Sequence, residues 1–253
     1  MNQFLTVPPG TYSDATLPAM ATDGNNNVFV AWQDTIRDQT TNQPVDHRIL
    51  AVKLNSNGGF LTFPIRVDTA ATNTVRSSVS LAVQNVCSGS GQACMFVADC
   101  PSGQTCSASA VVLSWWEGFN SGPETVFRKR LSSTLGNIDV TPIKVNQPPA
   151  LPSGVQRATS PSVAVDASNN FVVAWQANVN DADILTSLNG FGRSFSSAAV
   201  GLKNDFRIDL NGRSIQGATR AARSSQAKSF VYAWRDDRSG HFDIYTRRVQ
   251  SLP

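Results

Sequence analysis

The sequence predicts an all-β protein, a four-bladed β-propeller built of four-stranded antiparallel blades. The first observation is that four short apolar, β-branched runs each end in tryptophan, with a small residue directly before it. The second is their spacing, because the tryptophans are 83, 60 and 59 residues apart and the long first interval contains all four cysteines. Regular recurrence of one unit indicates a repeat architecture. The four runs are residues 28–32, 111–115, 171–175 and 230–234.

The first strand of a unit is followed by a turn that leads into the tryptophan strand. In the third unit, residues 162–166 are expected to form this strand and residues 167–170 the turn. The first unit has a similar turn at residues 23–27, and Asp23 and Asp166 each stand nine residues before the tryptophan. Aspartate and asparagine tolerate left-handed backbone angles, so these segments predict hairpins.

A third and a fourth strand complete each unit. Third strands are expected at residues 48–52, 125–128, 183–185 and 243–247. Fourth strands are expected at residues 64–68, 142–146 and 206–210, and the last unit has no such segment of its own.

The N-terminal segment is expected to supply the missing strand. Residues 4–8 alternate as the other fourth strands do, and their pairing with the last unit would close the ring and remove an open sheet edge. We therefore expect residues 1–253 to form one propeller domain, with residues 87–106 as an insert in the second blade. The alternative is a β-sandwich in which the tryptophans share one core.

Both faces of the tryptophan strand are apolar. In the third unit, Phe171, Val173 and Trp175 point one way, whereas Val172 and Ala174 point the other. This pattern is typical of a sheet that lies between two neighbouring sheets. The small residue before each tryptophan is expected to leave space for a bulky residue of the next blade.

The cysteines allow two interpretations. Cys87, Cys94, Cys100 and Cys106 lie in a stretch rich in serine, glycine and glutamine. A zinc site is disfavoured because no Cys-x2-Cys pair is present and no histidine lies nearby. Two disulfides are favoured because a short insert without its own core needs covalent links, and three pairings remain open. Disulfides predict an exported protein, secreted or at the cell surface, or in a periplasm.

Composition disfavours several classes of partner. The net charge of +3 is small and the basic residues are dispersed, so nucleic acid is not an expected partner. No run approaches the ~18 apolar residues of a membrane helix. No cofactor is expected, because the sequence has no glycine-rich phosphate loop and no transition-metal cluster.

Residues 161–175, together with residues 234–245, resemble a repeat common in exported bacterial proteins. The pattern is a proline, a strand ending in aspartate, a turn, a strand ending in Ala-Trp, and then an Asp-x-Arg-x-Gly turn before Asp-Ile-Tyr. Such repeats are similar to the blades of sialidase-like β-propellers, and the likeness covers most of the chain. It implies the fold and no active-site residue, because the sialidase box Ser-x-Asp-x-Gly-x-Thr-Trp occurs in no unit.

A sialidase-like glycoside hydrolase or lyase is the enzymatic alternative. It would need arginines for a substrate carboxylate and a tyrosine nucleophile. The arginines are Arg76, Arg157, Arg220 and Arg223, and the tyrosines are Tyr12, Tyr232 and Tyr245, of which Tyr232 is expected in the core. Ser/His/Asp chemistry is disfavoured because only His47 and His241 occur and no Gly-x-Ser-x-Gly elbow is present.

The loops after the tryptophans are the best binding candidates. In a propeller they gather on one face around the central channel, where polar side chains could bind sugar hydroxyls and Trp116 could stack on a ring. Carboxylates there could also hold Ca²⁺, although no EF-hand spacing is found. The competing interpretation is that these residues only form turns. The set is Gln33, Asp34, Arg37, Trp116, Glu117, Gln176, Asn178, Arg235, Asp236, Asp237 and Arg238.

The sequence therefore favours a non-enzymatic extracellular module with no catalytic residue. It would present these loops to a glycan or protein partner at the cell surface, or act as a subunit of a self-assembling surface structure. A third hypothesis is a spacer within a larger exported protein.

Overall fold

The protein is an all-β structure, as predicted. The structure, a computed structural model, describes residues 7–69, 74–119, 124–146, 157–178, 188–209, 216–224 and 229–250. These residues form four antiparallel sheets and one short 3-10 helix. None of the described helical residues makes a helix long and apolar enough to cross a membrane.

Each sheet is built from strands that follow one another in the chain. The first contains β1 (Thr11–Thr22), β2 (Val28–Asp38), β3 (Pro44–Leu54) and β4 (Ile65–Arg66). The second contains β5 (Thr74–Cys87), β6 (Cys106–Phe119), β7 (Thr125–Ser132) and β8 (Ile143–Lys144). The third contains β9 (Ala158–Val165), β10 (Phe171–Asn178), β11 (Leu188–Phe195) and β12 (Gly201–Arg207). The fourth has three strands in the described residues, β13 (Gln216–Arg223), β14 (Ser229–Asp236) and β15 (Asp243–Gln250).

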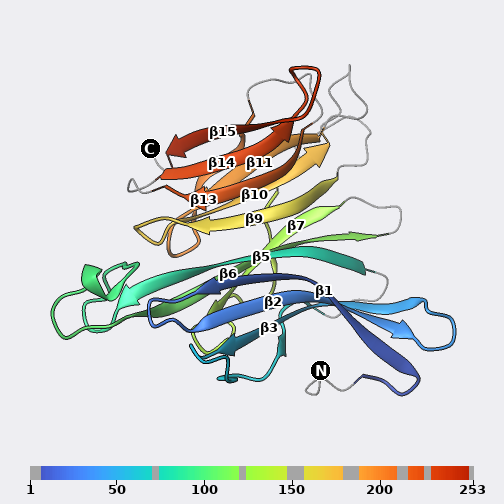
Figure 1. The fold of residues 1–253 in the computed structure, drawn as a ribbon, viewed down its shortest axis with the longest axis horizontal. Coiled ribbons are helices and arrows are strands. Elements are labelled where there is room, and N and C mark those ends of the chain that lie inside the picture. The colour runs from blue at the N-terminus through green and yellow to red at the C-terminus, as the bar shows by residue number, and fades with distance from the viewer. Residues whose placement is uncertain are drawn as a thin grey trace.

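The four sheets lie in a row in chain order, from the first at the bottom of Figure 1 to the last at the top. The largest contacts between sheets join their first strands, β1 with β5, β5 with β9 and β9 with β13. These strands therefore form the inner side of the array, which is the arrangement of propeller blades.

The row is open between the first and the last sheet. None of the larger contacts between described strands joins β1–β4 to β13–β15, and the first and the last sheet lie at opposite ends of the row in Figure 1. The closing strand was expected at residues 4–8. Residues 4–6 lie outside the described part, and Val7 and Pro8 belong to no strand. The four blades are thus confirmed, whereas the described residues do not close the ring.

The joints between sheets share one construction. Each buried tryptophan faces the preceding sheet: Trp115 shares an apolar cluster with Phe29, and Trp234 shares one with Val172. The small residues Ala31 and Ala174 lie in these same clusters, on the strand faces that meet the next sheet. The predicted role of the small residue is therefore supported. Three separate clusters between the sheets also rule out one common sandwich core.

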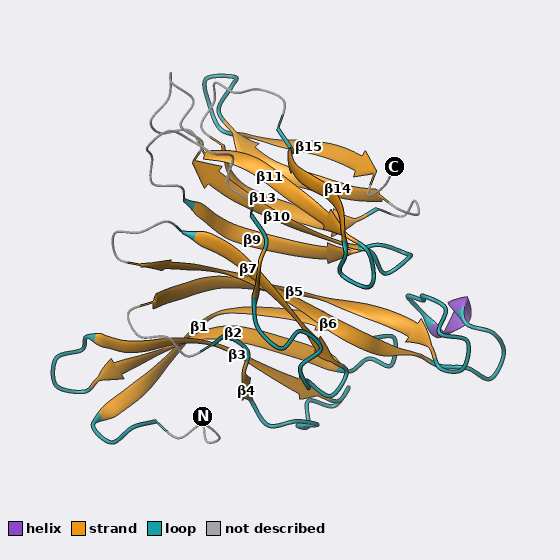
Figure 2. Ribbon diagram, turned by 180° about the vertical axis from the view of Figure 1, so that it is seen from behind, coloured by secondary structure: helices purple, strands orange, loops and turns teal. Residues whose placement is uncertain are grey.

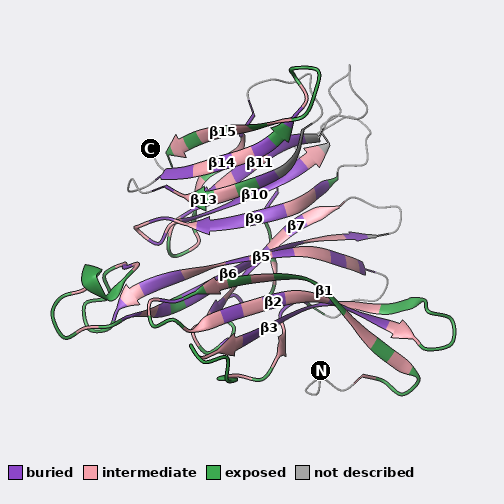
Figure 3. Ribbon diagram, viewed as in Figure 1, coloured by how far each residue is buried: buried purple, intermediate pink, exposed green. Residues whose placement is uncertain are grey.

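The ends of the row lack this cover. Trp32 faces away from the second sheet, is only half-buried, and lines a groove with Ala15 and Val30. Figure 3 shows β9, β10 and β14 largely buried, while β1 and β15 carry many exposed positions. The outermost faces of the array are therefore partly apolar and uncovered in the described structure.

A two-residue bulge interrupts the first strand of every sheet, opposite the tryptophan. Pairing skips residues 17–18 in β1, 78–79 in β5, 160–161 in β9 and 218–219 in β13. Leu17, Ser78 and Ser160 have φ angles of 51°, 56° and 51°, a region that non-glycine residues rarely adopt. Since a bulge bends its strand and re-aims side chains, the same local distortion recurs around the inner side.

The cysteine insert lies between β5 and β6 and contains the 3-10 helix Val97–Asp99 (Figure 2). Disulfides join Cys87 to Cys100 and Cys94 to Cys106, which confirms the disulfide interpretation and selects one of the three pairings. The insert packs on the first sheet: a Cβ at Gly24 would lie 2.5 Å from the carbonyl oxygen of Cys106, so only glycine fits there.

The predicted turns form as expected, but one sheet differs from the prediction. Asp166 Oδ1 accepts hydrogen bonds from the backbone N–H groups of Ser168 and Asn170, and Asp23 does the same in the first sheet. The third strand expected at residues 183–185 lies outside the described residues, and β11 follows it. Gly192 interrupts the apolar pattern of β11, and a Cβ at this position would lie 2.8 Å from the Phe206 ring. The fourth strand, β12, begins five residues earlier than predicted.

Candidate functional site

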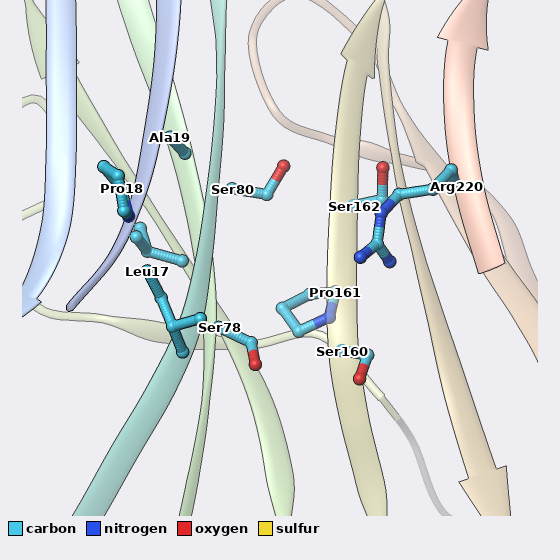
Figure 4. Close-up of a pocket in the computed structure, with 10 residues that line it drawn as sticks. Leu17, Pro18, Ala19, Ser78, Ser80, Ser160, Pro161, Ser162 and Arg220 are labelled. Atoms are coloured by element: carbon cyan, nitrogen blue, oxygen red, sulfur yellow. The ribbon is translucent and has the colours of Figure 1, made fainter. Parts of the chain in front are cut away.

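The inner strands line an open cavity of about 300 Å³. Figure 4 shows residues of β1 on one side of it and Arg220 of β13 on the other, with serines of β5 and β9 between them. The bulges supply most of this lining, because Leu17, Ser78 and Ser160 all border the cavity. The side formed by β1 is apolar, whereas the other sides carry hydroxyl groups and one guanidinium.

The only two glutamates of the chain lie at one end of the second sheet. Glu117 is near the end of β6 and pairs across the sheet with Thr125, the residue after Glu124. Glu117 shares its strand face with Trp115, and Glu124 belongs to the opposite face. The two carboxylates therefore flank one end of the β6–β7 pair, far along β6 from the disulfides at its start.

The two glutamates have different surroundings. Glu117 Oε1 accepts hydrogen bonds from Arg76 Nε at 3.2 Å and from the Trp115 indole at 2.8 Å. Arg76 is itself buried and also pairs with Asp68 at 3.0 Å. Glu124 is half-buried, and this burial raises its pKa, although the nearby Arg157 acts in the opposite direction.

Carboxylates two residues after the tryptophan recur in three sheets. Asp34 is buried and pairs with Arg48. Asp236 is buried, accepts a hydrogen bond from the Trp234 indole at 3.1 Å and pairs with Arg238. Asp236 ends β14 and accepts a hydrogen bond from the Arg238 N–H in the turn that follows, as the structural interpretation predicts, whereas Asp34 and Glu117 lie within their strands.

The remaining predicted binding residues are spread along one end of the row. Most belong to strands and not to loops, because β2, β6, β10 and β14 run beyond the tryptophan. Their positions are as follows: Gln33 and Arg37 are half-buried, Trp116 packs against the joint to the third sheet, Gln176 is buried, Arg235 is exposed over the Phe242 ring, and Asp237 and Arg238 lie in the β14–β15 turn. Asn178 ends β10, and its side chain lies outside the described set.

The described residues do not assemble a tyrosine-based sialidase site. Tyr232 is buried, as predicted, and burial raises its pKa strongly. Tyr12 hydrogen-bonds Asn42, and Tyr245 stacks on Trp234. The arginines do not form one cluster either. Arg76 is buried and ion-paired, whereas Arg220 borders the cavity.

Among the described residues, the one group of three side chains close enough to share a metal consists of Cys87, Cys94 and Cys100. All three are in disulfides. Three of the carboxylates considered for Ca²⁺ are paired with arginines, namely Asp34, Glu117 and Asp236.

Glu124 and the cavity serines were not among the predicted site residues. The available signal for Glu124 was that it is one of two glutamates, seven residues from the other. The serines carry no signal by themselves, because their place at the cavity depends on how the inner strands of different sheets pack together.

The sequence matches no protein-family model and no curated protein. Solved structures nevertheless resemble its fold. A thermostable family-43 glycoside hydrolase is 12% identical, with a TM-score of 0.50 over 95% of this chain and 77% of that protein. The GH93 α-L-arabinofuranosidase of Fusarium graminearum with arabinobiose is 11% identical, with a TM-score of 0.53 over 98% of this chain and 66% of that one. With an iminosugar inhibitor, the Fusarium enzyme gives a TM-score of 0.52 at 11% identity, over 100% of this chain and 66% of that one.

This likeness establishes the fold, and the chain spans just under two thirds of the length of the arabinofuranosidase. It also corrects the predicted function. The prediction of a non-enzymatic module is wrong, because the solved proteins with a similar fold are glycoside hydrolases. The enzymatic alternative is the better supported one.

Proposed function

We propose that this chain is an exported glycoside hydrolase that binds an oligosaccharide across the end of the sheets carrying Glu117 and Glu124. The observation that carries the proposal is the pair of glutamates at one strand end in unlike surroundings. Glycosidases use two carboxyl groups, one as proton donor and one as base or nucleophile, and unlike environments are what separate these roles.

Glu124 is the proposed general acid. Burial favours its protonated form, and a proton donor to the leaving oxygen must hold its proton until the glycosidic bond breaks. Arg157, which is exposed beside it, would remain available to the substrate.

Glu117 is the proposed base or nucleophile. Hydrogen bonds from Arg76 Nε and from the Trp115 indole fix the position of its carboxylate. Both donors favour a charged oxygen acceptor. Trp116 and Arg235, from the predicted binding set, are proposed to contact flanking sugars, because each keeps exposed surface at this end.

The substrate class proposed is a plant or microbial polysaccharide, and arabino-oligosaccharides are the first to test because a similar fold occurs in an α-L-arabinofuranosidase. Export is supported by the two disulfides, which persist in oxidising compartments. A glycan is accordingly the proposed partner.

The test is release of reducing sugar from linear arabino-oligosaccharides and a panel of other oligosaccharides by the purified protein. Glu124→Gln and Glu117→Gln should each lower kcat by about 100-fold or more. Asp99→Asn removes an exposed carboxylate in the cysteine insert, at the other end of β6 from Glu117, and should leave the rate unchanged. Hydrolysis that survives both glutamate substitutions, or no hydrolysis of any substrate by the folded wild type, would contradict the proposal.

A further inference from the structure

We infer that the cavity between the inner strands is a subsite for the carboxylate of an acidic sugar, with Arg220 as its charged donor. The inference rests on the proposed function in taking the ligand to be a glycan, and it adds the substrate class: a chain that contains uronic acid residues.

Arg220 is the charged group of this cavity. Its guanidinium points into the space beside Ser160 and Ser162 in Figure 4. Its one hydrogen bond within the described residues runs from Nη1 to the Thr219 carbonyl oxygen at 3.0 Å. A guanidinium has five N–H donors, so most of the donors of Arg220 have no partner among the described residues. None of the described residues that line the cavity carries a carboxylate.

Arg220 differs in this respect from two buried arginines of the second sheet. Arg76 pairs with Asp68 and Glu117, and Arg128 pairs with Asp139. Among the described residues, Arg220 makes no ion pair, although it is held on an inner strand at a bulge. Arg220 is also exposed, so its guanidinium can be reached by a ligand.

The serine hydroxyls add donors that point to the same kind of ligand. Ser80 Oγ accepts a hydrogen bond from the Val163 N–H at 3.1 Å, and Ser162 Oγ accepts one from the Ala221 N–H at 3.0 Å. A hydroxyl has one proton and two lone pairs. Since these bonds use lone pairs, each hydroxyl proton is left to donate to a ligand.

The bulges supply a second, independent indication of a site. Leu17, Ser78 and Ser160 hold left-handed backbone angles, and all three border this cavity. Such backbone costs of order 1–3 kcal/mol per residue and gathers at functional sites. One distortion therefore recurs where the blades converge on the cavity.

The lining fits an acidic sugar better than a free anion. Leu17, Pro18 and Ala19 form an apolar side opposite Arg220, which suits the carbon face of a pyranose ring. The planar guanidinium matches the two oxygens of a carboxylate. In an acidic sugar, the ring would contact the apolar side of the cavity and the carboxylate would contact Arg220. A small free acid would contact only Arg220.

The experiment is calorimetric binding of trigalacturonate, its trimethyl ester and acetate to the full chain at low salt. We expect trigalacturonate to bind at least about tenfold more tightly than the ester, as for a charge-assisted hydrogen bond, and acetate to bind far more weakly than the trimer. Arg220→Gln should abolish the preference for the acid over the ester. Arg248→Gln, on the exposed face of β15, is the matched control and should retain it.

Equal binding of acid and ester, retention of the preference in Arg220→Gln, or acetate binding as tight as the trimer would overturn the inference. Binding needs no hydrolysis, so the two proposals can fail separately. Acid-selective binding without hydrolysis would remove only the proposed enzyme activity, whereas hydrolysis of neutral substrates without acid preference would remove only this subsite.

Discussion

Single buried arginines join neighbouring blades. Arg128 of the second sheet pairs with Asp139 at 2.9 Å, lies 4.8 Å from the centre of the Phe195 ring, and donates to the Ala199 carbonyl oxygen. Phe195 and Ala199 belong to the third sheet and its β11–β12 connection. Burial lowers the pKa of Arg128, and Asp139 acts in the opposite direction. Asp139 therefore neutralises a charge that would otherwise be buried alone.

Removal of that partner should destabilise the fold. Asp139→Asn is expected to lower the free energy of unfolding by about 3 kcal/mol, because it leaves a buried guanidinium uncompensated. Asp14→Asn breaks the more exposed pair with Arg37 and should cost less than about 1 kcal/mol. Urea denaturation of both variants measures the difference, and equal losses would show that Asp139 has no special role.

The pKa of Glu124 gives a pH dependence with a defined sign. Burial raises this pKa above the ordinary value of 4.5, so the folded state binds more protons than the unfolded state in the interval between them. The stabilising effect of the proton is full below 4.5 and is lost as the pH rises through the folded pKa. The Glu124→Gln variant does not lose this stabilisation as the pH rises, because a glutamine side chain does not titrate.

The variant should therefore gain stability relative to the wild type as the pH rises from about 4 to 7. Thermal unfolding of both proteins across this range gives the comparison. A constant difference in Tm across the range would mean that the carboxyl group of Glu124 is not perturbed by folding.

The end of the β6–β7 hairpin sets the relation between the two glutamates. Adjacent strands lie about 4.8 Å apart, and Glu117 and Glu124 belong to opposite faces of the pair. This arrangement favours the wider carboxyl separation of inverting glycosidases, about 6.5–9.5 Å, over the shorter one of retaining enzymes. Proton NMR of the first-formed product should therefore show the anomer opposite to that of the substrate, and retention would contradict the assignment of the two roles.

The individual elements differ in how well sequence predicts them. The hairpins at Asp23 and Asp166 are predictable, because an aspartate side chain that bonds its own turn is a local interaction. The third strand of the third sheet is harder to predict, since Gly192 is required by the Phe206 ring, a contact that local pattern does not contain.

The candidate site was only partly predictable for the same reason. The residues after each tryptophan are found by position, but Asp34 and Asp236 serve buried ion pairs that depend on neighbouring strands. The bulge residues have no common chemistry, as Leu17 and Ser78 illustrate, so sequence gives no sign that they face one cavity.

At the scale of the whole molecule, the joints explain why the blades stack in a row. The small residue of one sheet leaves room for the tryptophan of the next, as Ala174 does beside Trp234. Ala233 is the equivalent residue of the last sheet and is only half-buried, because no described strand covers it. Trp32 is the corresponding uncovered tryptophan at the other end.

The two alanines should therefore respond differently to the same substitution. Ala174→Leu overfills a packed joint and should cost about 1–3 kcal/mol, whereas Ala233→Leu should change the free energy of unfolding little. Chemical denaturation of the two variants measures the contrast. A comparable loss at Ala233 would indicate that the last sheet is covered in solution.

The central claim is that a glycan lies across the end of the sheets that carries the two glutamates. A crystal structure of Glu124→Gln with an oligosaccharide tests it most directly. We expect a glycosidic oxygen about 2.6–3.2 Å from the side-chain amide of residue 124, with the sugar chain continuing toward Arg220. A sugar bound only at the opposite end, beside the disulfides of Cys87 and Cys106, would contradict the claim.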